Sequence, residues 1–407
     1  MNTFLYGSAQ RSRSSLRGFT LLELIIVMSI GGFITMLIIG LLLKAREKSR
    51  QELCSDNLRQ IIRGVRAYEE TNGRFPPGRL KPDWTRNGFP LSGYTNYESV
   101  QQTANEKTGF YSVHVWILPH VNAQKTYDKI DFTRAQAKRM LDSQDQPHNI
   151  NYAPYTQPMP QYLCPADPNT SAQGITENNY RYNFGGSTPG AGARNLPNVY
   201  EPRPTDLYHP GGNGAFTIGE LGLESSAYTD GLSKTVFFSE RSKGDNSDPT
   251  VSLSNTTAII RSASAGAPSV PVDIMLQGCA STVPALSQFV FTTAGRFPPN
   301  SQWANGWPFA GYDSTEYNHL APPNWEKIDC GLSSFVPDTP VEMAIIAARS
   351  QHAGGVNVAY GDGRVKFIKN EIALIPWRAF GTRNGEEMLQ QQTQQTQQSQ
   401  KQGSQSQ

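Results

Sequence analysis

The feature that most constrains this chain is a long apolar run near its N-terminus, from Phe19 to Leu43. The run exceeds the ~20 residues that a helix needs to cross a bilayer, and the ~7–15 apolar residues of a cleavable secretory signal. Its flanking small residue, Gly18, precedes the run, whereas a secretory signal is cut after its apolar stretch. The sequence therefore predicts a transmembrane segment over residues 19–43.

A single acidic residue, Glu23, interrupts this run. A carboxylate within a membrane span is costly, and it usually has a partner or a function. If the chain is cut between Gly18 and Phe19, the new α-ammonium group can pair with Glu23 of the same or a neighbouring subunit. Such a buried pair favours a defined register more than it adds stability.

Residues 17–23 (RGFTLLE) and the apolar run after them resemble the N-terminus of type IV prepilins and of the pseudopilins of type II secretion. The resemblance implies that a prepilin peptidase cuts after Gly18 and methylates the amine of Phe19, and that Glu23 directs assembly with other pilin-like subunits. It also implies a single-pass protein of the inner membrane whose C-terminal domain lies outside the cytoplasm, in the periplasm or at the cell surface. Basic residues flank both ends of the run, so charge alone does not decide the orientation. An uncleaved signal anchor remains the alternative.

The helix is expected to continue beyond the membrane to Thr71, because apolar residues recur at steps of three and four from Cys54 to Tyr68. Asn72-Gly73 offers a C-cap, and the prolines at 76 and 77 prevent the helix from continuing.

The rest of the chain combines short apolar runs with turn residues, and Gly (36) and Pro (28) are plentiful. Candidate strands are residues 215–218, 235–239 and 288–292, while 112–118 and 342–349 fit either a strand or a helix. We therefore expect an α+β fold: a long N-terminal helix packed on an antiparallel β-sheet, with a loop-rich, β-dominated C-terminal domain. The expected organisation is a leader (1–18), a transmembrane segment (19–43), the soluble half of the helix (44–78), a globular domain (79–388) and a disordered Gln-rich tail (389–407).

A formal net charge of +2 gives no reason to expect a nucleic-acid partner.

Two alternating runs, 355–360 and 364–368, flank Gly361-Asp362-Gly363 and predict a β-hairpin. We expect Val356, Val358 and Tyr360 to share one face with Val365 and Phe367, and Arg364 and Lys366 to face solvent.

His352 precedes Asp362 and Gly363 with nine residues between the histidine and the aspartate. This H-X9-DG spacing is similar to the C-terminal signature of a bacterial family with prepilin leaders, the domain of unknown function 1559. Further segments along the chain are similar to that family and occur in the same order as in its members, at 54–58, 73–78, 115–119, 162–167, 229–235, 322–324 and 377–382.

The four cysteines, Cys54, Cys164, Cys279 and Cys330, contain no C-x-x-C pair and no histidine at metal-site spacing, which argues against a zinc site. An even number in an exported domain favours disulfides, with three pairings open, and four buried free thiols are the alternative. The matching family segments imply the pairs Cys54–Cys164 and Cys279–Cys330.

The candidates for an active site are His352, Asp362, Asp230 and Glu240, but a turn role for Asp362 and Asp230 and a packing role for His352 are the simpler interpretations. No phosphate loop, nucleophile elbow or H-E-x-x-H motif occurs, so no enzymatic activity and no cofactor are expected. Calcium would have Asp230, Asp245, Asp248 and Asp362 as oxygen ligands, although their spacing matches no known loop.

We expect a pilin- or pseudopilin-like structural subunit; the alternative is a surface module that binds carbohydrate or protein and uses the helix only as an anchor.

Overall fold

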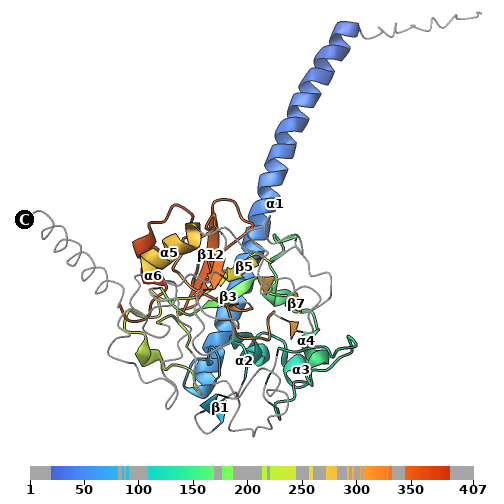
Figure 1. The fold of residues 1–407 in the computed structure, drawn as a ribbon. Helices are drawn as coiled ribbons and strands as arrows, with labels where there is room; N and C mark the ends of the chain where they lie inside the picture. Colours follow the sequence, from blue (N-terminus) through green and yellow to red (C-terminus); the bar gives the residue numbers. More distant parts are fainter. Residues whose placement is uncertain are drawn as a thin grey trace, which may run out of the picture. The chain divides into compact units, whose positions relative to one another are not determined.

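A computed structural model describes residues 20–80, 85–86, 89–90, 109–134, 136, 138–168, 177–186, 213–217, 221–243, 256–259, 272–281, 291–292, 296–297, 303–304, 306–312, 314–327, 329–331 and 344–385 (Figure 1). The chain divides into two units, residues 1–49 and residues 50–407. Helix α1 (Leu21–Asn72) contributes to both. The predicted leader and the Gln-rich tail lie outside the described residues.

In the first unit, a capping box starts helix α1. The backbone N–H of Glu23 donates to Oγ1 of Thr20 (3.2 Å), and the backbone N–H of Thr20 donates to Oε2 of Glu23 (2.8 Å). The large apolar side chains between Leu21 and Leu43 are exposed. The helix is thus long and apolar enough to cross a membrane, and its apolar surface is not covered by protein within this unit.

In the second unit, one face of α1 is part of the hydrophobic core. Its buried residues include Cys54, Leu58, Ile61, Ile62 and Val65, which follow the predicted helical spacing. Gly64 makes close contact possible, because a Cβ atom there would lie 2.6 Å from a methyl group of Val121. The helix ends where the sequence indicated: Gly73 has a φ of +70° and its N–H donates to the carbonyl of Glu69.

The main sheet has five strands in the order β13-β12-β4-β3-β9. Their bounds are β3 Tyr180–Asn183, β4 Val236–Glu240, β9 Glu316–Tyr317, β12 Gly355–Tyr360 and β13 Val365–Lys369. The pairs β13–β12, β12–β4 and β4–β3 are antiparallel, as predicted, but the pair β3–β9 is parallel. The sheet is therefore mixed, because β9 reaches its edge through a long connection after β4 rather than through a hairpin.

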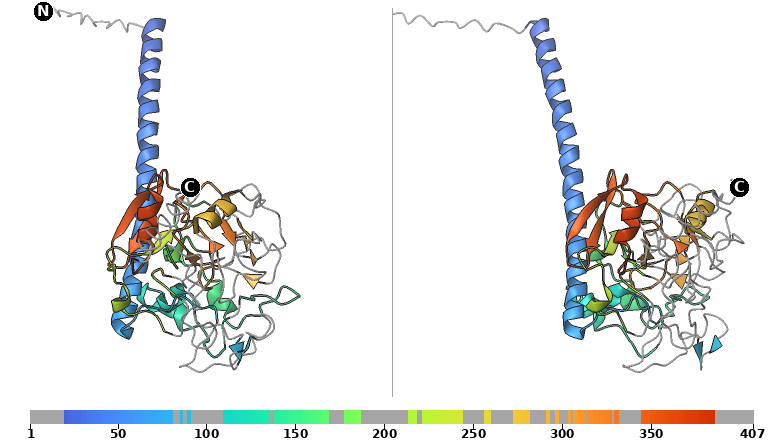
Figure 2. Two further views of the ribbon diagram at one scale, coloured as in Figure 1. Left: turned by 60° about the vertical axis from the view of Figure 1, so that its left-hand side comes forward. Right: turned by 90° about the vertical axis from the view of Figure 1, so that its left-hand side faces the viewer.

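The central strands of this sheet are covered on both faces. Every residue of β3, β4 and β12 is buried. Figure 2 shows the β12–β13 hairpin beside the part of α1 that belongs to this unit. An aromatic layer adjoins the sheet: Phe216 lies edge-to-face against Phe237, Phe238 and Tyr182. These large rings bury much of the apolar surface that stabilises the unit.

The C-terminal hairpin forms as predicted, and Arg364 and Lys366 are exposed as predicted, but Val365 and Phe367 do not share the face of Val356 and Val358. Val358 pairs with Lys366 and Ala359 with Val365, so Lys366 shares the face of Val358 while Val365 lies on the other face. The backbone N–H of Tyr360 donates to the carbonyl of Arg364, so the loop has the three residues that the sequence indicated, with Gly363 at a φ of +94°. In this register directly opposite residues share a face, which places Ile368 and Lys366 with Val356 and Val358.

The remaining elements are short. Among the described residues, three small sheets contain the other strands. One has the order β11 (Ala344–Ile345), β10 (Asp329–Gly331), β5 (Thr256–Ile259) and β6 (Phe291–Thr292). The other two pair β1 (Thr85–Arg86) with β2 (Phe89–Pro90) and β7 (Arg296–Phe297) with β8 (Trp303–Ala304). The helices are α2 (Val113–Trp116), α3 (Gln124–Tyr127), α4 (Tyr152–Tyr155), α5 (Val272–Ser281) and α6 (Leu374–Phe380), with 3-10 turns η2 (Leu118–His120), η3 (Pro160–Tyr162) and η5 (Ser225–Ala227).

The structure decides between strand and helix in the two segments for which the sequence left both open. The stretch 112–118 is largely helical, and the described part of the second stretch, 344–349, contains the short strand β11. Residues 215–217 are buried but form no strand; the backbone of Phe216 donates to Asn183, and Thr217 accepts from Gly78. Their hydrogen bonds go to separate segments rather than to one neighbouring strand, so the strand prediction for 215–218 is wrong over its described part.

Candidate functional site

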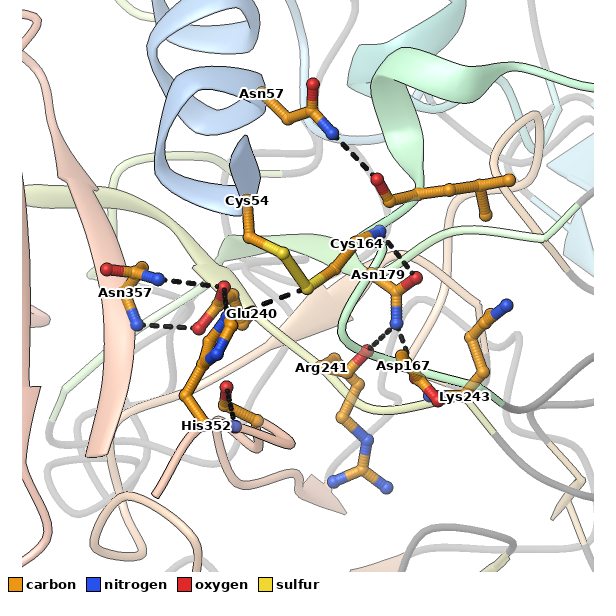
Figure 3. The surroundings of a disulfide bond; sticks show 12 residues. Cys54, Asn57, Cys164, Asp167, Asn179, Glu240, Arg241, Lys243, His352 and Asn357 are labelled. Atoms are coloured by element: carbon orange, nitrogen blue, oxygen red, sulfur yellow. Dashed lines mark hydrogen bonds and ion pairs between the residues drawn. A yellow bond between two sulfur atoms is a disulfide. The ribbon is translucent and has the colours of Figure 1, made fainter. Parts of the chain in front are cut away.

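A disulfide joins helix α1 to the segment after η3. Cys54 and Cys164 are bonded across 110 residues of sequence, and both are buried (Figure 3). This is the first of the two pairings that the family resemblance implied. Next to it, the side-chain amide of Asn57, one helical turn after Cys54, donates to the carbonyl of Leu163 (2.7 Å). Two neighbouring links thus hold the same segment against the helix.

The side chain of Asn179 fixes Cys164 from the other side. Its Oδ1 accepts from the backbone N–H of Cys164 (2.9 Å), and its Nδ2 donates to Oδ2 of Asp167 (2.6 Å) and to the carbonyl of Arg241 (3.1 Å). Asn179 is buried and precedes strand β3. The loop that carries Cys164 is therefore tied to the end of strand β4 as well as to α1.

His352 and Glu240 lie directly beside the disulfide. The Nε2 atom of His352 is 3.6 Å from Sγ of Cys164 and 3.3 Å from Oε1 of Glu240. Glu240 is the last residue of β4, and its side chain is only 2% exposed. Asn357 in β12 holds this carboxylate with its backbone N–H (2.7 Å) and its Nδ2 (3.0 Å). Two of the four active-site candidates thus meet, in a buried position.

The turn that carries His352 is positioned by Asn324. Its Oδ1 accepts from the backbone N–H of Ser350, and its Nδ2 donates to the carbonyl of Gly355 and to Oδ1 of Asn370. Asn324 itself has a φ of +50°, a conformation that asparagine tolerates better than most residues. The hydroxyl of Ser350 then accepts from the backbone N–H of His352 (3.0 Å). Asn324, in the segment 322–324 that resembles the family, therefore positions the turn that carries the histidine.

Asp362 and Gly363 lie at the opposite end of β12 from His352. The six-residue strand between them spans roughly 20 Å. Asp362 accepts from the backbone N–H of Arg364 (3.1 Å) and pairs with its guanidinium. The H-X9-DG spacing therefore places His352 at one end of β12, beside the disulfide and Glu240, and Asp362-Gly363 at the other end, in the turn.

Asp230, the remaining candidate, also has a local role. Its Oδ2 accepts from the backbone N–H of Gly385, and its own N–H donates to the carbonyl of Arg383. Of the proposed calcium ligands, Asp245 and Asp248 lie outside the described residues, as do Gly18 and Phe19. The structure records Cys279 as disulfide-bonded, and the side chain of Cys330, its predicted partner, is not among those described.

A buried charge network adjoins Glu240 and was not foreseen. Asp329 pairs with Arg241 and with Arg349, and all three side chains are at most 5% exposed. Burial lowers the pKa of Arg241 to about 10, while the Asp329 carboxylate favours its charged form. Such a network ties β10 to the end of β4 and fixes the geometry more than it adds stability. Charged residues this far apart in the sequence carry no sequence signal for this arrangement.

All of these residues fall within one recognised region. The family model described as "protein of unknown function (DUF1559)" matches residues 43–374. The chain belongs to this family. No curated protein and no solved structure was found to match it.

The DUF1559 region includes Cys54, Cys164, Glu240 and His352, so the cluster belongs to the family's own domain. The DUF1559 match begins after Glu23, and the segment that resembles prepilins precedes it. Membership in DUF1559 together with the exposed apolar helix fits a membrane-anchored surface protein.

Proposed function

We propose that this protein is a pilin- or pseudopilin-like structural subunit that is exported through the prepilin pathway. A prepilin peptidase removes residues 1–18 and methylates the amine of Phe19; the globular unit then lies outside the cytoplasm. Other pilin-like subunits of a type II secretion or type IV pilus-like assembly are its partners. The observation that carries the proposal is the exposed apolar surface of α1 from Leu21 to Leu43, which requires lipid or neighbouring helices to cover it.

The capping box adds a second role for Glu23 that must be separated from assembly. Its carboxylate caps its own helix through Thr20, which by itself accounts for an acidic residue at this position. In the proposal, the same carboxylate also provides the negative charge that pairs with the Phe19 amine of a neighbouring subunit. Capping needs a hydrogen-bond acceptor, whereas the pairing needs a charge.

Two variants distinguish these roles. Glu23→Gln keeps a residue that completes a capping box but removes the charge, while Thr20→Ala removes the cap and keeps the charge. We expect Glu23→Gln to abolish oligomers trapped by cross-linking in native membranes, and Thr20→Ala to retain them. Mass spectrometry of the N-terminal peptide should find N-methyl Phe19 in the wild type. An intact Met1 leader, or cross-linking that is unchanged in Glu23→Gln, would contradict the proposal and favour a binding module with a plain anchor.

The proposal includes a structural rather than a catalytic role for the globular unit. His352 and Glu240 are 3% and 2% exposed, so a substrate cannot reach them without local opening. Asp362 and Asp230 are engaged in turns. This burial supports a role for the H-X9-DG histidine in building the domain.

A further inference from the structure

Four potential metal-ligating atoms converge at the disulfide. One donor atom each from Cys54, Cys164, Glu240 and His352 lies within 4.8 Å of all the others, and all four residues are buried. They come from α1, from the segment after η3, from the end of β4 and from the turn before β12. Side chains from four separate segments of the chain thus meet at one point (Figure 3).

The position of the imidazole indicates what this point can hold. Nε2 of His352 faces both a sulfur atom and a carboxylate oxygen, at 3.6 and 3.3 Å. A single ring nitrogen has one lone pair or one proton, so it cannot bond fully to both neighbours. A metal ion bound between the three groups would interact with each of them, because donor atoms that share a metal lie about 3–4 Å apart at bond lengths of ~2.0–2.3 Å.

The surroundings match those of a metal site in a second respect. Asn357 donates two hydrogen bonds to Glu240, and Asn179 binds the backbone N–H of Cys164. Outer hydrogen bonds of this kind fix the orientation of ligands and raise metal affinity. The donor set of two sulfurs, one imidazole and one carboxylate suits Zn²⁺, which accepts all three ligand types in tetrahedral geometry.

We propose that, in its dithiol state, the chain binds one Zn²⁺ ion through Cys54, Cys164, Glu240 and His352, and that this metal site and the disulfide are alternative cross-links of α1 to the segment 163–167. The proposal does not depend on the assembly function. It gives the histidine of the H-X9-DG spacing a ligand role that sequence spacing alone argued against.

The two states interconvert by a balanced exchange. The dithiol state exists in the newly made chain before the bond forms, or it is produced by a dithiol reductant. The reductant passes two electrons and two protons to the cysteines, the S–S bond breaks, and the reductant becomes a disulfide. Binding of Zn²⁺ then releases the two thiol protons to solvent. A two-electron oxidant reverses the sequence and releases the metal.

The test uses the full chain in detergent. The protein is unfolded with a phosphine reductant and refolded without oxygen, with and without Zn²⁺, so that the buried bond does not limit reduction. After desalting, zinc is measured by mass spectrometry of the metal, and Co²⁺ is substituted to record the thiolate charge-transfer band. The phosphine also reduces the disulfide of Cys279. We expect one Zn²⁺ per chain in the reduced protein and none in the disulfide protein.

Variants decide whether the folded site is responsible. His352→Ala and Glu240→Gln should each weaken zinc affinity at least tenfold, and Asn357→Ala should cause a smaller loss. Cys164→Ser should abolish the site, whereas Cys279→Ser and His120→Ala, which lie outside the cluster, should leave it intact. Failure of the dithiol chain to bind zinc or to refold with it, or binding that is equal in His352→Ala and Glu240→Gln, would overturn the proposal, because thiols of an unfolded chain bind metal without these partners.

Discussion

Nε2 of His352 lies 3.6 Å from Sγ of Cys164, although 188 residues separate the two in sequence. The contact joins the start of the C-terminal hairpin to the disulfide that fastens α1. It explains why a histidine stands before β12: the residue contacts the sulfur of one segment and the Glu240 carboxylate of another. The H-X9-DG spacing therefore connects a buried contact between three segments with a surface turn.

Loss of the Cys54–Cys164 bond should lower stability without abolishing the fold. The bond closes a loop of 110 residues, and its removal should reduce the free energy of unfolding by about 2–5 kcal/mol. Urea unfolding of the double variant Cys54→Ser/Cys164→Ser, followed by the fluorescence of buried Trp307 and Trp377, measures this. A reductant should destabilise the wild type more than this variant; equal sensitivity would show that the bond does not carry the effect.

Replacing Asn324 should loosen the turn that carries His352. Asn324→Ala removes hydrogen bonds to Ser350, Gly355 and Asn370 and places alanine at a φ of +50°, which together should cost about 2–4 kcal/mol. Asn324→Gly loses the same bonds, but glycine adopts a positive φ without steric cost. It should therefore be less destabilised in urea unfolding than Asn324→Ala. If both variants unfold like the wild type, the side-chain bonds do not hold the turn.

The Asp-Gly of the H-X9-DG spacing should matter through its turn. Gly363 has a φ of +94°, and a Cβ atom there would meet nothing within 4 Å, so Gly363→Ala should cost about 1 kcal/mol for conformational reasons alone. Gly363→Asn should cost less, because asparagine tolerates positive φ better than alanine. The matched replacement Gly278→Ala, in helix α5, should be neutral or stabilising. Thermal unfolding of the three variants gives the comparison, and equal midpoints for Gly363→Ala and the wild type would contradict it.

Buried histidines should make the fold sensitive to acid. Burial lowers the pKa of His114 and of His319 from the ordinary 6.5 to about 3. The unfolded chain then binds protons at a higher pH than the folded chain. The contribution of these histidines to the free energy of unfolding is therefore full above pH 6.5 and is lost as the pH falls towards 3. Each histidine contributes a slope of at most ~1.4 kcal/mol per pH unit within that window.

His114→Phe isolates one of these contributions. The ring of His114 lies edge-to-face against Tyr162 and Phe238, an environment that accepts another aromatic ring. We expect the variant to be folded at neutral pH and to lose stability less steeply between pH 6.5 and 4 than the wild type. A slope that does not change would assign the acid sensitivity to other groups.

Local patterns determined much of this protein. The length of the apolar run predicted the exposed N-terminal part of α1, and the spacing of Leu58, Ile61 and Val65 predicted its buried face. Gly73 ends the helix because glycine adopts a positive φ without steric cost. The alternation around Gly361 and Gly363 predicted the C-terminal hairpin. Thr20 and Glu23 also carried a capping signature that could have been recognised from the sequence alone.

Tertiary structure decided what depends on contacts between distant segments. The parallel pairing of β9 depends on the route of a long connection. The meeting of Glu240, His352 and Cys164 depends on packing between β4, the turn before β12 and the segment after η3. Local propensity acts over a few residues, whereas these arrangements are set by burial and hydrogen bonding across more than a hundred.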